Sequence, residues 1–168
     1  ASLDFFGDMG LTDCESIYMY DGSPLLLYDD GGSPVLFHHL YHTNSFVRIP
    51  GGDLSTPTID SGSFQVFRGA QMMTSDEKIG LQKVWYAPRH ADTAQFVVQQ
   101  LRIFSADGAL HSGVALGEFI DWDIPSSGNT GGFDAARKLI YQQGNSANCE
   151  DNLLRYGGMA LLAIGTSG

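Results

Sequence analysis

The sequence predicts an all-β protein, a β-sandwich with jelly-roll or Greek-key-like connections. Glycine occurs 21 times among 168 residues, often in turn dipeptides such as Asp21-Gly22, Gly31-Gly32 and Asp107-Gly108. Between the turns lie short segments rich in β-branched, aromatic and aliphatic residues, which favour strands. An apolar pattern with the period of a helix never persists beyond two turns. These three observations together favour a sandwich of many short strands.

The expected strands follow one another along the whole chain, and several of them alternate with period two. They span residues 16–20, 24–28, 35–42, 45–49, 64–73, 79–86, 95–104, 114–123, 138–142 and 155–164. The Asp-Asp-Gly-Gly run after residue 28 predicts a hairpin, and Asp107-Gly108 predicts the tip of a second one. Residues 133–141 are the one helical candidate, and they are short enough to be a strand instead.

The length of 168 residues predicts a single domain that covers residues 1–168. The chain begins Ala-Ser-Leu and ends Gly-Thr-Ser-Gly directly after an apolar stretch. Such ends are typical of a domain excised from a longer multidomain protein. Other domains of the same polypeptide are therefore its expected partners.

The charge balance excludes two classes of partner. With 19 acidic against 9 basic residues, the formal net charge is -10, which repels nucleic-acid phosphates and anionic membranes. The longest apolar runs, residues 24–28 and 159–164, are far shorter than the ~20 residues of a membrane helix. We therefore expect neither nucleic-acid binding nor membrane insertion.

The densest group of chemically interesting side chains follows the expected strand 114–123. Asp121 and Asp123 would project to the same side about 7 Å apart, and a glycine-rich loop could fold Asn129 and Asp134 back toward them. Such hard oxygen ligands suit Ca²⁺, so these four residues are a candidate calcium site. In the alternative interpretation, the aspartates cap turn amides or pair with the basic residues at 137 and 138.

The same carboxylates raise the alternative of a hydrolase. Asp121 and Asp123 have a separation compatible with glycoside hydrolysis, and Glu118 shares a face with Ile120 and Trp122 as an isolated candidate for a buried acid. The polar loop shows no sign of the desolvation that would raise a carboxyl pKa. The chain has neither a G-x-S-x-G nor an S-x-x-K motif, so no catalytic residue is assigned.

Aromatic residues suggest a binding function. Trp85, Tyr86 and Trp122 could supply rings on which a sugar stacks, although tryptophan and tyrosine in β-sandwiches are more often core residues. His38 and His42 share a strand face about 13 Å apart, too far to hold one metal ion.

Two cysteines, Cys14 and Cys149, lie near opposite ends of the chain. In a secreted protein they could form a disulfide that closes a long loop, whereas in a cytosolic protein they would be two unrelated thiols. Neither belongs to a C-x-x-C pair, so the spacing leaves both readings open.

The second half of the chain resembles a non-catalytic β-rich module found in large secreted or surface proteins of bacteria. The matching segments are 84–88, 95–103, 109–110, 112–124, 129–134 and 156–162. The Asp-Trp-Asp-Ile run at 121–124 carries most of the likeness. The resemblance implies an extracellular or cell-surface location and a β-rich architecture. Together with the aromatic residues and the aspartate loop, it leads us to expect an accessory or interaction module with a glycan or a protein as its ligand. It assigns no catalytic residue.

Overall fold

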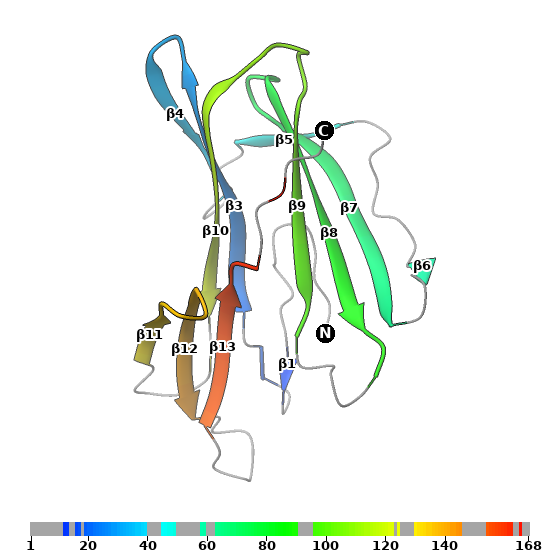
Figure 1. Ribbon diagram of the computed structural model, residues 1–168, viewed down its shortest axis with the longest axis vertical. Helices are drawn as coiled ribbons and strands as arrows, with labels where there is room; N and C mark the ends of the chain where they lie inside the picture. Colours follow the sequence, from blue (N-terminus) through cyan, green and yellow to red (C-terminus); the bar gives the residue numbers. More distant parts are fainter. Residues whose placement is uncertain are drawn as a thin grey trace. The chain divides into compact units, whose positions relative to one another are not determined.

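The computed structural model of the chain describes residues 12–13, 16–17, 19–39, 45–49, 58–59, 63–90, 96–122, 124, 130–145, 154–162 and 165 (Figure 1). Every regular element in these ranges is a β-strand, which confirms the all-β prediction. Within the same ranges, no helical segment has the length and hydropathy that a membrane crossing requires. The chain divides into two compact units: the larger contains Ser23–Phe119, and the smaller contains Gly7–Gly22 and Ile120–Gly168.

The larger unit is built from two antiparallel sheets that enclose one core. The first has the order β10-β3-β4, and the second has the order β5-β7-β8-β9, with β6 also paired to β7 (Figure 1). The strands of the first sheet are β3 (Met19–Asp30), β4 (Ser33–Phe37) and β10 (Ser112–Trp122). Those of the second are β5 (Phe46–Arg48), β6 (Thr58–Ile59), β7 (Phe64–Thr74), β8 (Ile79–Pro88) and β9 (Val98–Ser105).

A single cluster of buried side chains joins the two sheets and makes this unit a β-sandwich. Its members come from both layers: Leu26, Tyr28, Phe37, Phe46, Met72, Ile79 and Leu81. β10 pairs with β3 although some eighty residues separate them in the chain, and the strands of the second sheet lie within that interval. Burial of these apolar side chains is the main source of the unit's stability.

The hairpin predicted after residue 28 is confirmed. Asp30 pairs with Ser33, so Gly31 and Gly32 alone make the turn between β3 and β4. Their φ angles are 62° and 90°, and positive φ at both central positions is the requirement of a type I′ turn. The Asp29 carboxylate accepts a hydrogen bond from the Gly32 amide at 2.7 Å, which holds the turn from inside.

The second predicted hairpin is wrong. The turn at Asp107-Gly108 forms, but β9 pairs with β8 and β10 pairs with β3, so the chain crosses from one sheet to the other (Figure 1). Asp107 organises this crossing: its carboxylate accepts hydrogen bonds from the Ala109 amide and the Ser105 hydroxyl, both at 2.9 Å. Turn residues specify that the chain reverses; they do not specify which strand pairs with which.

The Asp107 turn gives the first prediction, which concerns pH. The hydrogen bonds from the Ala109 amide and the His111 ring lower the pKa of Asp107 from 3.8 to about 2. A lowered folded-state pKa stabilises the fold above the unfolded value and loses that stabilisation as pH falls through the folded value. We expect the melting temperature of Asp107→Asn to fall less than that of the wild type between pH 4 and pH 2. Equal slopes in thermal melts over this range would contradict the prediction.

β7 carries a bulge that the expected regular strand 64–73 did not include. Its register against β8 shifts between Arg68 and Gln71. Gly69 lies in this interval, and a Cβ there would come within 3.0 Å of the Trp85 ring. The bulge and the glycine together make room for Trp85 in the interior, where only 5% of it is exposed.

The smaller unit holds a three-stranded antiparallel sheet of order β11-β12-β13, together with the short pair β1 (Thr12–Asp13) and β2 (Ser16–Ile17). The sheet consists of β11 (Thr130–Asp134), β12 (Leu139–Asn145) and β13 (Leu154–Ala160).

The predicted strand at 138–142 is confirmed. The glycine-rich loop expected between Asp123 and Asp134 is wrong for residues 130–134, because these residues pair with β12 in a hairpin closed by Asp134 and Leu139. That pairing also overturns the helical alternative for residues 133–141.

Candidate functional site

The register of the three-stranded sheet brings two tyrosines onto one face. Tyr141 lies opposite Gly158 on β13 and opposite Gly132 on β11, while Gln143 lies opposite Tyr156. Directly opposite residues of an antiparallel pair share a face, and so do alternate residues of one strand. Leu139, Tyr141, Gln143, Tyr156 and Gly158 therefore form one surface, which we call the tyrosine face.

Glycines let the tyrosine rings lie close to the backbone. A Cβ on Gly132 would collide with the phenol ring of Tyr141, so this ring occupies the space above β11. A Cβ on Gly158 would come within 2.8 Å of the Ile140 carbonyl oxygen. Side chains at these two positions would fill the face, and their absence leaves it hollow.

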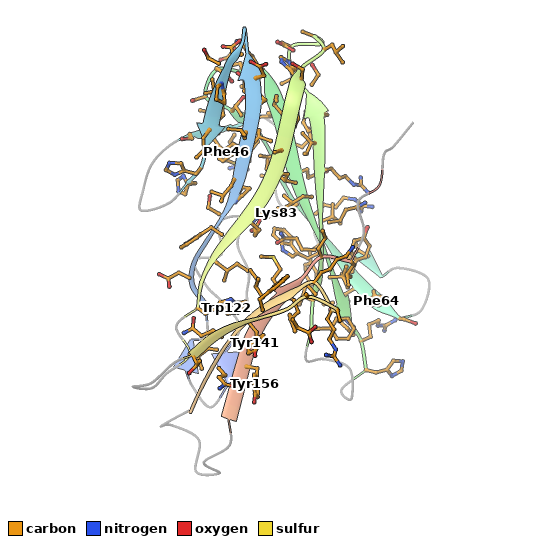
Figure 2. The ribbon with its side chains drawn as sticks, turned by 60° about the vertical axis from the view of Figure 1, so that its left-hand side comes forward. Phe46, Phe64, Lys83, Trp122, Tyr141 and Tyr156 are labelled. Carbon is orange, nitrogen blue, oxygen red and sulfur yellow. The ribbon has the colours of Figure 1, made fainter. Side chains whose placement is uncertain are left out.

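The tyrosine face is an open depression with aromatic walls. The rings of Tyr141 and Tyr156 have centroids 6.3 Å apart and planes inclined at 56° (Figure 2). Tyr156 is 62% exposed. The depression has a volume of about 410 Å³ and is lined by Leu139, Tyr141, Gln143, Tyr156, Gly157 and Gly158. Its described lining offers apolar surface, two phenol groups and one amide, and it contains no charged side chain.

Trp122, one of the ring residues singled out in the sequence, lies against the other face of this sheet. A Cβ on Gly157 would come within 2.6 Å of Cε3 of the Trp122 indole, so the ring packs directly on that glycine. Trp122 also lines a smaller depression of about 140 Å³ with Ile120, Gly131, Ile140, Tyr141 and Gln142. The tryptophan is half-buried and supports the sheet from behind the tyrosine face.

The other two predicted ring residues belong to β8. Trp85 is buried and its indole N–H donates a hydrogen bond to the Gln99 side chain at 3.0 Å, so it presents no ring face to solvent. Tyr86 is half-buried, and its hydroxyl donates to the Gln100 side chain at 3.1 Å. Trp85 is therefore a core residue, which is the alternative that the sequence also allowed.

The candidate calcium ligands are only partly within the described residues. Asp121 is a half-buried residue of β10, and Asp123 and Asn129 lie outside the described residues. Asp134 ends β11, where its carboxylate accepts a hydrogen bond from the Arg137 amide at 3.0 Å and pairs with the Arg137 guanidinium. These bonds lower the pKa of Asp134. Among the described residues, no three histidine, cysteine or acidic side chains are grouped to hold a metal ion, and the calcium site stays a prediction.

Glu118 lies in the interior of the larger unit, where it pairs with a lysine. Its Oε1 is 2.5 Å from Nζ of Lys83, and the two side chains are 8% and 3% exposed. Lys83 belongs to β8 and Glu118 to β10, so the pair connects the two layers of the sandwich. Neither residue lines either of the two depressions. The sequence marked Glu118 as a candidate buried acid, and its partner Lys83 was missed.

A second polar cluster lies beside the core of the same unit. The buried Tyr28 donates its hydroxyl proton to the Asp76 carboxylate, which also accepts from the Thr74 hydroxyl at 2.5 Å. Burial and the hydrogen bond to Asp76 raise the pKa of Tyr28 well above its usual value. Burial raises the pKa of Asp76, but hydrogen bonds from Thr74, Tyr28 and the Lys78 amide outweigh that effect and lower it. The cluster satisfies the polar groups at this end of the core.

Comparison of the chain with protein-family models, with curated proteins and with solved structures gives no match. The resemblance of the second half to bacterial surface modules therefore stays a prediction.

Cys14 and Cys149 lie outside the described residues, as does His42.

Sequence reasoning missed the two residues that define the tyrosine face. Tyr141 stands in the segment Leu139–Asn145, and Tyr156 directly precedes the pair Gly157-Gly158. A tyrosine next to glycines in a strand is a usable signal, since the missing side chains leave ring faces uncovered. The signal becomes specific only when the register places both tyrosines on one face.

Proposed function

We propose that the chain is an accessory binding module of a secreted or cell-surface bacterial protein, and that its tyrosine face binds a neutral glycan. The observation that carries this proposal is the pair of neighbouring tyrosine rings in an open, glycine-floored depression whose lining contains no charged side chain. The extracellular location and the bacterial source rest on the sequence resemblance alone.

The chemistry of the face favours a sugar chain. A pyranose ring presents a patch of C–H groups that packs against an aromatic ring, and hydroxyls at its rim that need hydrogen-bond partners. Tyr141 and Tyr156 supply the rings, and their hydroxyls and the Gln143 amide supply donors and acceptors. An open depression leaves room for a chain to continue beyond the residues bound in it.

The charge of the protein narrows the class of glycan. The chain carries a formal net charge of -10, and no cation stands among the residues that line the depression. An acidic polysaccharide would meet repulsion without a compensating ion pair. A neutral glycan suits the face better.

The hydrolase alternative has less support. Glu118 is enclosed with Lys83 in the interior, and only 8% of its side chain is exposed to an incoming polymeric substrate. Asp121 is half-buried on β10, and Asp123 lies outside the described residues.

The test is binding of soluble neutral polysaccharides by isothermal titration calorimetry. A β-glucan, a mannan and a xylan are suitable probes, with an acidic polysaccharide for comparison. For any probe that binds, we expect Tyr156→Ala to raise Kd at least about tenfold, because an exposed aromatic anchor carries much of the energy of such a site.

The chain offers a matched control for this variant. Phe133 is 67% exposed and belongs to the same sheet, but it pairs with Ile140 and so lies on the opposite face. Phe133→Ala should leave Kd unchanged. The proposal fails if the wild type binds none of the neutral probes, or if Tyr156→Ala binds as tightly as the wild type. Preference for the acidic probe would also contradict it.

A further inference from the structure

The Lys83–Glu118 pair is unusual in its position and its surroundings. Both side chains are more than nine-tenths buried, and they come from β8 and β10, which belong to opposite layers of the sandwich (Figure 1). On β8, Lys83 is flanked at alternate positions by Leu81 and Trp85, which are 0% and 5% exposed. Two opposite charges are thus enclosed in a mainly apolar interior, where each has lost its hydration.

One atom of the pair is unsatisfied. Oε1 of Glu118 contacts Nζ of Lys83, but Oε2 is buried and has no hydrogen-bond partner among the described residues. A buried carboxylate oxygen without a donor is costly, because nothing replaces the water that it has lost. The ionic form of the pair therefore leaves an uncompensated polar atom in the core.

We propose that Lys83 and Glu118 condense to an intramolecular amide that covalently links β8 to β10. A proton first passes from the Lys83 ammonium to the Glu118 carboxylate along their 2.5 Å contact, which gives an amine and a carboxylic acid. The Nζ lone pair then attacks Cδ, and an N–C bond forms. The C–O bond to the protonated oxygen breaks, and that oxygen leaves with the proton that it received and a second proton from the nitrogen. The products are one secondary amide and one water molecule, with no oxidation or reduction.

Three features of the interior favour this reaction. The fold holds the nitrogen and the carboxyl group in contact, and such fixed geometry can correspond to an effective molarity of about 10⁵–10⁸ M. The amide is neutral, so the condensation removes two buried charges from a low-dielectric environment. It also expels Oε1 as water and turns the unpaired Oε2 into a neutral amide oxygen, which costs less to bury than a carboxylate oxygen does.

Such an amide would be a covalent cross-link between the two layers of the sandwich. It joins the central region of β8 to β10, and so closes residues 83–118 into a covalent loop. An amide, unlike a disulfide, is not cleaved by reducing agents, so the link would persist in either redox environment. This benefit does not depend on the ligand of the tyrosine face, so the two proposals can fail separately.

The experiment is mass spectrometry of the purified chain under denaturing and reducing conditions. We expect an intact mass lower than the sequence mass by one water molecule. We also expect a tryptic product in which the peptide containing Lys83 is joined to the peptide containing Glu118. The joined product is necessary because a succinimide at one of the three Asp-Gly bonds, at Asp21, Asp30 or Asp107, would also remove one water. A full sequence mass, or a deficit without the joined peptides, would overturn the proposal.

Three variants test whether Lys83 and Glu118 are the residues that form the amide. Lys83→Met should show its full sequence mass. Lys78→Met is the matched control, because Lys78 pairs with Asp30 at 2.8 Å between the same two sheets but in solvent, and it should keep the deficit. Glu118→Gln should give the same joined peptides through loss of ammonia instead of water. Persistence of the deficit in Lys83→Met, or its disappearance in Lys78→Met, would assign the modification elsewhere and contradict the proposal.

Discussion

Replacing Lys83 with methionine should lower the free energy of unfolding by at least about 3–5 kcal/mol. Methionine is close to lysine in length and shape, so the core keeps its packing while Glu118 loses its partner. The carboxylate of Glu118 is 8% exposed, and it would remain in the interior without a counter-ion. Urea denaturation followed by circular dichroism measures the change.

A second ion pair across the same sheets is the control for this prediction. Lys78 and Asp30 are 33% and 48% exposed, and an exposed pair contributes only about 0–1 kcal/mol. We therefore expect Lys78→Met to leave stability almost unchanged. Destabilisation of Lys83→Met by less than about 1 kcal/mol would show that the buried pair carries little of the fold energy.

The double variant Lys83→Met/Glu118→Leu distinguishes the contribution of the buried charges to stability from that of the covalent link. It removes both charged groups, so the penalty of an unpaired carboxylate disappears. Without an amide in the wild type, the double variant should recover nearly wild-type stability. With the amide, it should stay about 3–4 kcal/mol less stable, since opening the loop 83–118 returns conformational entropy to the unfolded chain.

Gly157→Ala should destabilise the smaller unit by about 1–3 kcal/mol. The added Cβ would lie 2.6 Å from Cε3 and 3.0 Å from Cδ2 of the Trp122 ring, so the ring must move. The movement should alter the emission of Trp122, one of two tryptophans in the chain; the other, Trp85, is in the core of the larger unit. Thermal melting and tryptophan fluorescence measure the two effects.

The matched variant is Gly131→Ala in the neighbouring strand. A Cβ there meets only the Tyr141 carbonyl oxygen, at 3.8 Å, which is an ordinary contact. An alanine also restricts the unfolded chain more than a glycine does, so this variant should be neutral or slightly stabilising. If the two variants behave alike, Trp122 does not pack on Gly157 as described.

Much of the strand content could be predicted from residue types and their spacing along the chain. The alternation in residues 64–73 and 79–86 corresponds to β7 and β8, and Gly31-Gly32 determined the tight turn between β3 and β4. These features depend on neighbouring residues, so a single sequence contains them. Residues 130–134 were mistaken for a loop because the pair Gly131-Gly132 is typical of a turn. In the structure both glycines are paired in the ladder of β11, and Gly132 lies under the Tyr141 ring.

Pairing between distant segments was not predictable in the same way. Asp107-Gly108 has the composition of a hairpin tip, yet the strands on its two sides enter different sheets. The Lys83–Glu118 contact and the Tyr141–Tyr156 contact both depend on such long-range placement. Only one local hint existed for the first of these contacts: Lys83 shares its strand face with Leu81 and Trp85, where a charged residue requires a buried partner.

β10 has a consequence for proteolysis. Its residues run from Ser112 in the larger unit to Trp122 in the smaller one as continuous strand, and β3 crosses the same boundary between Gly22 and Ser23. Tandem modules are usually separated by cutting an exposed linker, because proteases need several residues of extended, accessible chain. At both crossings the chain is β-strand, so it has no linker there of the kind that proteases cut.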